Sequence, residues 1–122
     1  MNRNVLIAGG GIAGLATGLA AARAGWCATL FERAAEFSEV GAGVQLGPNV
    51  TRILQAWGLG DAFKQVAAFP ASLHARSMNT GEVLATMSLT DACTTYGAPY
   101  ITIHRADLHG LLLQAASSEG VQ

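Results

Sequence analysis

Three glycines and one acidic residue near the N-terminus have the spacing of a dinucleotide-binding site. The glycines form the pattern Gly9-x-Gly11-x-x-Gly14, and Glu32 follows further along the chain. In such a pattern the first glycine permits a tight turn, the second admits a pyrophosphate, and the third lets a helix pack closely on a strand. The N–H groups at the start of that helix attract phosphates. Glu32 would accept hydrogen bonds from both ribose hydroxyls and would repel a 2′-phosphate, which disfavours NADP.

The pattern is informative only if strands and a helix surround it in the right order. Residues 5–8 form a short branched apolar run, which predicts a strand buried on both faces. Helical spacing of apolar residues runs from 12 to 24, and Gly25 is typical of the residue that follows a helix. Residues 27–31 predict a second buried strand that Glu32 follows. The sequence therefore predicts a βαβ unit with a right-handed crossover.

The rest of the chain predicts more helices, a β-hairpin and two strands. The first expected elements are a helix from Pro48, a short helix from an N-cap at Asp61 to Val66, and hairpin strands at 72–78 and 82–89. A polar loop is expected at 90–99 and a strand at 100–103. A helix from Arg105 to near Gly120 and a further strand that opens at 121–122 complete the chain. Asp107 is expected to cap the helix that begins at Arg105. The predicted fold class is α/β: a Rossmann-like dinucleotide-binding fold with an inserted β-hairpin, incomplete at the C-terminus.

Composition excludes several classes of function. The chain has 122 residues, of which 51% are hydrophobic and only 12% are charged, so it is long enough for one folded domain. Its net charge is -1, so it lacks the excess of basic residues that favours binding to nucleic acid. The apolar stretch 4–22 contains five glycines, so it is a poor membrane span or signal peptide. We expect a cytoplasmic protein with no membrane and no nucleic-acid partner, whose oligomeric state the sequence leaves open.

The remaining reactive side chains give weak signals. Cys27 and Cys93 cannot form a disulfide scaffold, and Cys27 lies in an apolar run where a buried position is expected. His104 and His109 are five positions apart, unlike the histidine pair of a zinc-binding helix, so we predict no metal site. No residue of this chain is assigned as catalytic.

Three blocks of sequence carry a resemblance to a known family. They are residues 5–15 together with 30–33, residues 39–49, and residues 104–108. These blocks resemble the N-terminal part of the flavin-dependent aromatic-ring hydroxylases, which are single-component FAD monooxygenases. The branch they resemble contains salicylate hydroxylase and 3-hydroxybenzoate 6-hydroxylase. The first block is shared by many flavoproteins, whereas the other two together are fairly specific.

The resemblance implies FAD as the bound cofactor, NAD(P)H as the reductant, and a small aromatic substrate. It also implies that each position matching a family motif contacts FAD. Gly9 belongs to the same cofactor-binding set because it permits the tight turn. The implied contacts are Gly11, Ala13 and Gly14 beside the pyrophosphate, Glu32 at the adenosine ribose, Arg33 by the adenine, Gly43 and Val44 along the flavin, and Arg105 as a cation that contacts FAD.

Family members are longer than this chain and contain a second FAD motif and a substrate domain. We therefore expect residues 1–122 to be the N-terminal portion of an FAD-binding domain, without the substrate domain. The expected function is the FAD-binding portion of a monooxygenase that hydroxylates a phenolic or aromatic acid with NAD(P)H and O2. Two alternatives stay open: a non-catalytic dinucleotide-binding fragment or remnant, and an NAD-dependent dehydrogenase domain. The block at 41–49 and the hairpin argue against the dehydrogenase.

Overall fold

The protein is described by a computed structural model that covers residues 3–35 and 41–122. These residues divide into two compact units. Unit 1 consists of Met1–Ala42 and His104–Gln122, and unit 2 consists of Gly43–Ile103. Each unit is described by itself below. No helix in the described part of the chain is both long enough and apolar enough to cross a membrane.

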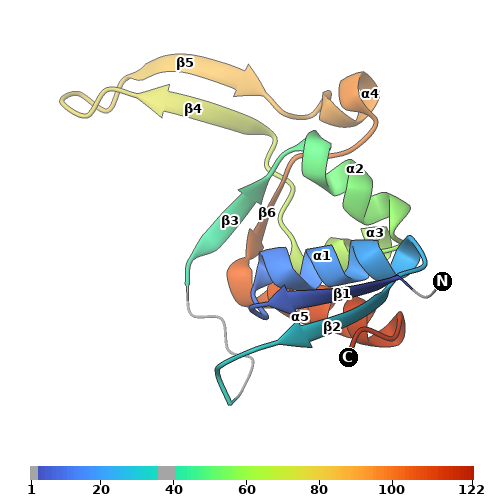
Figure 1. The fold of residues 1–122 in the computed structure, drawn as a ribbon. Helices are drawn as coiled ribbons and strands as arrows, with labels where there is room; N and C mark the ends of the chain where they lie inside the picture. The colour runs from blue at the N-terminus through green and yellow to red at the C-terminus, as the bar shows by residue number, and fades with distance from the viewer. Residues whose placement is uncertain (1–2, 36–40) are drawn as a thin grey trace. The chain divides into compact units, whose positions relative to one another are not determined.

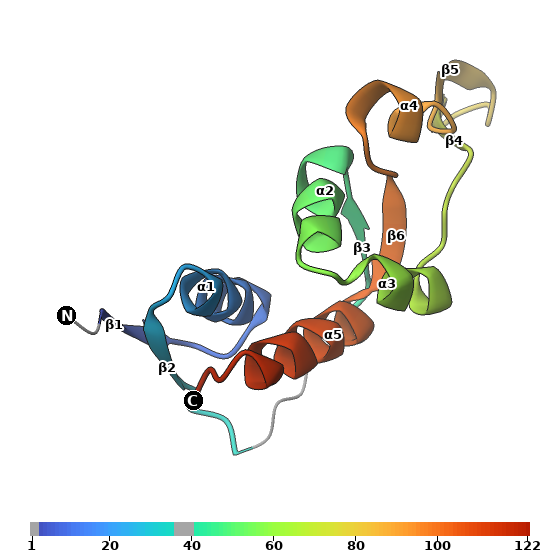
Figure 2. The same cartoon turned by 90° about the vertical axis from the view of Figure 1, so that its right-hand side faces the viewer.

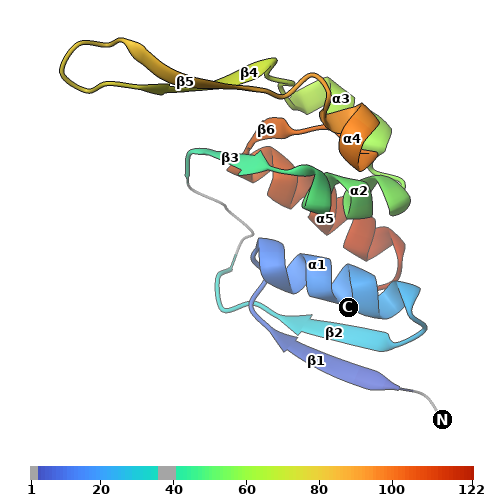
Figure 3. The same cartoon turned by 90° about the horizontal axis from the view of Figure 1, so that it is seen from above.

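Unit 1 contains the predicted βαβ arrangement. Strand β1 (Asn4–Ala8), helix α1 (Ile12–Arg23) and strand β2 (Cys27–Phe31) follow one another along the chain (Figure 1). β1 and β2 pair in parallel along their whole length. Helix α5 (Arg105–Ser118) lies beside α1, as Figure 3 shows. Gly25 has the left-handed conformation, with φ of +79°, that was predicted for the end of the first helix.

The chain returns to β2 after α5. The Gln122 N–H donates to the Ala28 carbonyl at 3.0 Å, and the Leu30 N–H donates to the Gln122 carbonyl at 2.6 Å. This pair of bonds on either side of Thr29 is the pattern of a parallel ladder. It agrees with the prediction that a further strand opens at Val121 and Gln122.

The core of unit 1 lies between α1, α5 and one face of the sheet. Leu15, Leu19, Leu108 and Leu112 are all almost completely buried there, as is Ile7 of β1. The two helices meet along these leucines because their apolar residues recur every three or four positions. Burying a leucine contributes about 1.5–3 kcal/mol, so this contact is a main source of stability for the unit.

The expectation that both strands are buried on both faces is wrong for the described residues. Leu6 is 73% exposed and Phe31 is 59% exposed, and Cys27 is also exposed rather than buried. Successive strand residues point to opposite faces, so Ile7 packs under α1 while Leu6 points the other way. Within unit 1, no described helix covers the face on which Leu6 lies.

Unit 2 contains three helices and four strands among its described residues (Figure 2). Strand β3 pairs with β6, and β4 forms an antiparallel hairpin with β5 as predicted. The elements are β3 (Gly43–Leu46), α2 (Pro48–Ala56), α3 (Gly60–Val66), β4 (Ser72–Arg76), β5 (Val83–Ser88), α4 (Ala92–Tyr96) and β6 (Ile101–His104). Thr51 is buried and its hydroxyl donates to the Pro99 carbonyl at 2.7 Å, which ties α2 to the segment before β6.

Three details of unit 2 differ from the sequence-based expectation. β3 was not predicted, because a four-residue strand that starts at Gly43 has little pattern of its own. The polar segment 90–99 contains the short helix α4 rather than a loop throughout. The N-cap of α3 is Leu59, and Asp61 lies in the first turn, where it forms an ion pair with Lys64 at 2.9 Å.

Candidate functional site

The glycine-rich loop between β1 and α1 requires glycine for two different physical reasons. Gly9 has a φ of +107°, which L side chains rarely adopt, although space around it is open. Gly14 has an ordinary backbone, but a Cβ there would overlap the carbonyl oxygen of Gly9. The start of α1 therefore lies directly against the backbone of the loop that follows β1. The Gly9 N–H donates to the Phe31 carbonyl at 2.7 Å and holds the loop at the end of β2.

The N-terminus of α1 is open to an anion. Gly11 is its N-cap, and within the described residues no side chain accepts a capping hydrogen bond there and no acidic residue lies in the first turn. The first N–H groups of a helix have no partner inside the helix, and they carry the positive end of its dipole. Ala13, which is exposed in this first turn, leaves the approach to these groups uncharged. This arrangement fits a pyrophosphate.

Glu32 lies at the end of β2 and contacts the loop. Its Oε2 accepts from the Gly10 N–H at 2.6 Å, and its Oε1 accepts from the Ala34 N–H at 2.8 Å. These two bonds, the Ala34 bond first, lower the pKa of Glu32 below its ordinary value of 4.5. The side chain is therefore an ionised carboxylate at neutral pH. A carboxylate has about four acceptor positions, so these backbone bonds do not use up its capacity to accept from hydroxyl groups of a ligand.

A hollow lies between the loop and the end of β2. Its volume is about 490 Å³, and its lining consists of Ala8, Gly9, Phe31, Glu32 and Arg33. Volumes of this order are typical of small-molecule sites. The structure thus brings together three of the sequence-predicted residues around a space that is large enough for a nucleoside.

Arg105 is the first residue of α5 and is half-buried. A Cβ placed on Gly41 would lie 3.1 Å from Arg105 Cδ, so the arginine side chain packs against that glycine. The expectation that Asp107 caps α5 is wrong. The N-cap is His104, whose Nδ1 accepts from the Ala106 N–H at 3.2 Å, because its ring reaches the second residue of the helix.

The remaining predicted contacts fall outside unit 1 or outside the described residues. Gly43 and Val44 belong to β3 of unit 2. A Cβ on Gly43 would lie 3.7 Å from the Ile103 carbonyl oxygen, in ordinary contact with the paired strand. Glu39 and Val40, which belong to the second block of the resemblance, lie outside the described residues.

Sequence reasoning missed the role of His109. This residue is buried on α5, and its Nε2 lies 2.7 Å from the carbonyl oxygen of Gly10 in the loop. A polar side chain between Leu108 and Leu112 on an apolar helix face was the available signal, because buried polar groups almost always have a partner. No group of three metal-ligating side chains occurs in the described ranges.

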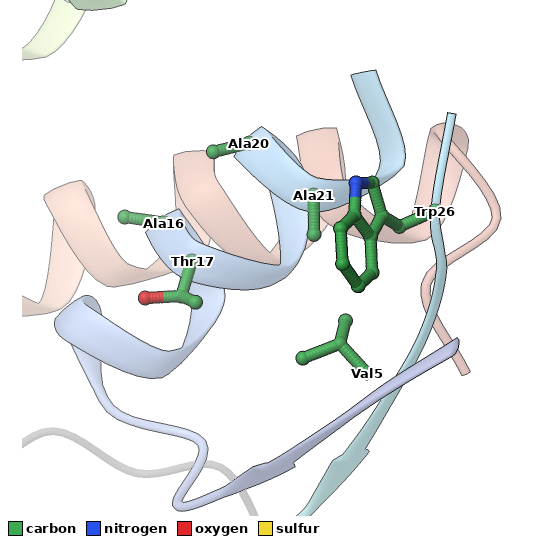
Figure 4. A pocket seen from close by; sticks show the side chains of 6 residues that line it. All are labelled: Val5, Ala16, Thr17, Ala20, Ala21 and Trp26. Carbon is green, nitrogen blue, oxygen red and sulfur yellow. The ribbon is translucent and has the colours of Figure 1, made fainter. Parts of the chain in front are cut away.

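A second hollow of unit 1 is lined mainly by α1 and lacks the chemistry of a cofactor site. Its volume is about 570 Å³, and Figure 4 shows its lining of Val5, Ala16, Thr17, Ala20, Ala21 and Trp26. Thr17 supplies the only hydroxyl among these residues, and that hydroxyl donates to the Ala13 carbonyl at 2.7 Å. Apart from the Trp26 indole N–H, the rest of the lining is apolar, and none of it is charged.

The chain is similar to several known flavin-dependent enzymes and monooxygenases. The chain is 39% identical to 3-hydroxybenzoate 6-hydroxylase 1 from Aquipseudomonas alcaligenes, over 99% of this chain and 31% of the relative. It is 38% identical to 6-hydroxynicotinate 3-monooxygenase from Pseudomonas fluorescens, over 91% of this chain and 29% of the relative. The chain thus spans about 30% of the length of the curated relatives that it matches.

A solved structure agrees with the fold. The tetrameric form of 2-methyl-3-hydroxypyridine-5-carboxylic acid oxygenase superposes with a TM-score of 0.84 and 29% identity, over 99% of this chain and 30% of that chain. The predicted α/β class and the predicted resemblance are both confirmed by these comparisons. A family model described as FAD binding domain matches residues 2–122, and the chain therefore belongs to the FAD binding domain family.

Proposed function

We propose that this chain is the FAD-binding portion of a flavin-dependent monooxygenase that hydroxylates a phenolic or aromatic acid with NAD(P)H and O2. The observation that carries the proposal is the uncapped start of α1 beside an ionised Glu32, in a chain that belongs to the FAD binding domain family. The names of its relatives favour a small hydroxylated aromatic substrate. Bound FAD would supply the redox chemistry, and the protein binds and orients it. A cytoplasmic location fits the same reading.

Residues of unit 1 would bind the adenosine and the pyrophosphate of the dinucleotide. Glu32 would accept hydrogen bonds from the ribose hydroxyls with its remaining acceptor capacity, and Arg33 would lie by the adenine. Gly11, Ala13 and Gly14 would place the start of α1 at the pyrophosphate, which carries two negative charges that one helix end only partly offsets. Arg105 would supply the additional positive charge.

Residues of unit 2 would serve the flavin end of the cofactor. The resemblance assigns Gly43 and Val44, both on β3, to a stretch whose backbone passes the flavin. Glycine at position 43 leaves that backbone open to close approach, which supports the assignment. The catalytic groups that activate an aromatic substrate are not assigned to any residue of this chain.

A non-catalytic dinucleotide-binding fragment is the second candidate function. The uncapped start of α1 and the ionised Glu32 would bind a dinucleotide in this case as well, whether or not catalysis follows. Flavin released from the purified protein on denaturation, together with its intact mass, separates this candidate from a working hydroxylase. An NAD-dependent dehydrogenase domain is disfavoured by the hairpin of β4 and β5, which a simple NAD-binding fold lacks between its strands.

The test is a titration of the full chain with FAD, NAD and NADP by calorimetry, with Glu32→Gln as the matched variant. We expect FAD to bind most tightly and Glu32→Gln to weaken FAD binding by about tenfold, because the charged acceptor is lost. The pKa of Glu32 is depressed, so its contribution is complete above pH 4.5 and is lost as the pH falls through the lower, folded-state pKa.

The Glu32→Gln variant also serves as the control for the pH dependence of FAD binding. Wild-type affinity should fall with acidification below pH 4.5, and the variant should show only the smaller change that comes from protonation of the ligand itself. Tighter binding of NAD than of FAD would reject the flavin assignment. Equal affinities of wild type and variant for FAD would reject the ribose role of Glu32.

A further inference from the structure

Gly10, in the middle of the glycine-rich loop, is held at both of its backbone polar groups. Its N–H donates to Glu32 Oε2 at 2.6 Å, and its carbonyl oxygen lies 2.7 Å from His109 Nε2. Gly10 is itself buried. One loop residue is thus tied to the end of β2 and to α5 at the same time, and all of these elements belong to unit 1.

The hydrogen bond to the Gly10 carbonyl specifies the state of the His109 ring. A carbonyl oxygen only accepts, so Nε2 of His109 must carry a proton. His109 is 5% exposed, and its neighbours on the same helix face, Leu108 and Leu112, are apolar. An apolar residue at this position would leave the buried Gly10 carbonyl without this donor. The histidine therefore satisfies a polar group of the loop from within an apolar helix face.

The direction of the Gly10 carbonyl also determines the direction of the next N–H group. In a trans peptide the C=O of one residue and the N–H of the next point to opposite sides of the chain. The described residues contain no cis peptide bond. His109 holds the Gly10 carbonyl toward α5, so the Gly11 N–H points the opposite way. Gly11 is the N-cap of α1, where an anion would bind.

The same hydrogen bond fixes α5 to the loop. Arg105 precedes His109 by four residues, which places the two side chains on one face of the helix, one turn apart. Anchoring His109 at Gly10 therefore also sets the position of the first turn of α5, from which Arg105 projects.

We propose that His109 is a positioning residue for the cofactor pyrophosphate. Its Nε2–H orients the Gly10–Gly11 peptide so that the Gly11 N–H is presented to the phosphate, and it holds the helix that carries Arg105 beside the loop. Glu32 completes the arrangement from the other side of Gly10. This inference rests on the proposed FAD-binding function and adds a buried residue that does not itself touch the cofactor.

The experiment compares wild type with His109→Gln, His109→Phe and Leu112→Ala in the full chain. Glutamine keeps an N–H donor, whereas phenylalanine keeps a planar ring and removes the donor. Leu112 is 1% exposed on the same helix face, so Leu112→Ala loosens α5 without removing the hydrogen bond. FAD affinity is measured by flavin fluorescence at a temperature where each variant is folded, and stability is measured by thermal unfolding. Nitrogen-15 NMR reports the His109 tautomer and the Gly11 amide shift without any ligand.

We expect His109→Phe to weaken FAD binding by about tenfold and His109→Gln to stay within about twofold of wild type. Leu112→Ala should lower the unfolding temperature most, with FAD affinity unchanged in the folded fraction. The NMR spectra should show a proton on Nε2 in wild type and a displaced Gly11 amide in His109→Phe. Should the phenylalanine variant fail to fold, the tautomer in wild type still decides whether His109 donates to Gly10, and a large loss of FAD affinity in His109→Gln would overturn the proposal.

Wild-type affinity in His109→Phe would overturn the proposal, and so would an equal loss of affinity in Leu112→Ala, which would reduce His109 to a packing residue. A proton on Nδ1 instead of Nε2 would also overturn it, whatever the affinity. Failure of the wild-type chain to bind FAD would overturn the proposed function and the cofactor role together. The tautomer and the Gly11 shift would then still report whether the hydrogen bond exists.

Discussion

Helices α1 and α5 pack side by side in unit 1, but their N-termini are built in opposite ways. α1 begins after Gly11 with neither a side-chain cap nor an acidic residue in its first turn, as far as the described residues show. α5 begins after His104, whose ring accepts from the Ala106 N–H, and Asp107 supplies an acidic residue in the first turn. The N-terminus of α5 is capped by the protein itself, whereas the N-terminus of α1 is the end where we propose that a phosphate binds.

Under the proposed function, this difference marks a place where helix stability is given up for binding. An N-terminal cap contributes about 0.5–2 kcal/mol to a helix, and a capping side chain at Gly11 would occupy the N–H groups that a phosphate needs. Arg105 shows the reverse case, since a cation in the first turn of α5 opposes the helix dipole. Asp107 offsets part of that cost.

The largest effect is expected where the loop and α1 are in contact. Gly14→Ala places a Cβ on the Gly9 carbonyl oxygen, so the loop must shift. FAD affinity should fall by about a hundredfold or more, with a stability loss of about 1–3 kcal/mol from overpacking. Calorimetric titration and urea denaturation measure the two quantities.

The matched control for this change is Gly110→Ala on α5. A Cβ at Gly110 meets nothing within 4 Å, and alanine favours a helix, so the variant should gain about 0.5–1 kcal/mol and bind FAD normally. Similar affinities of the two alanine variants for FAD would show that close packing at Gly14 is not needed for binding.

An intermediate effect is expected when α1 is given the acidic first turn that α5 already has. Ala13→Glu should stabilise the helix by about 0.3–1 kcal/mol through the helix dipole, while it weakens FAD binding by about tenfold through repulsion of the pyrophosphate. Ala13→Gln adds the same length without the charge and should change neither quantity much. The two changes in Ala13→Glu have opposite signs, which general damage to the fold cannot produce. Stronger FAD binding by Ala13→Glu would place the phosphates elsewhere.

The smallest effect on binding is expected at the capped helix. His104→Ala removes the side chain that accepts from the Ala106 N–H, so unfolding should become easier by about 1 kcal/mol. FAD affinity should stay within about twofold of wild type. A large loss of affinity with no loss of stability would mean that the start of α5, like the start of α1, is a binding element.

Much of unit 1 could be predicted from local patterns. The bounds of α1 and β2, the left-handed Gly25 and the close approach at Gly14 all follow from residue types over short stretches. Which side chains of those elements are buried was harder to predict. Leu6 belongs to an apolar run that is typical of a strand buried on both faces, yet it is 73% exposed, because a run of side chains does not reveal which face of a strand other elements cover.

The sequence by itself determined the glycine pattern, the order of the βαβ elements and the acidic residue that follows β2. These features depend on backbone conformation and on spacing along the chain, which a sequence records directly. Only the tertiary structure showed that His109 contacts Gly10 across 99 positions and that His104 rather than Asp107 caps α5. Such contacts depend on how helices pack and on which rotamers fit, and the physical determinants of that packing are distributed over the whole unit.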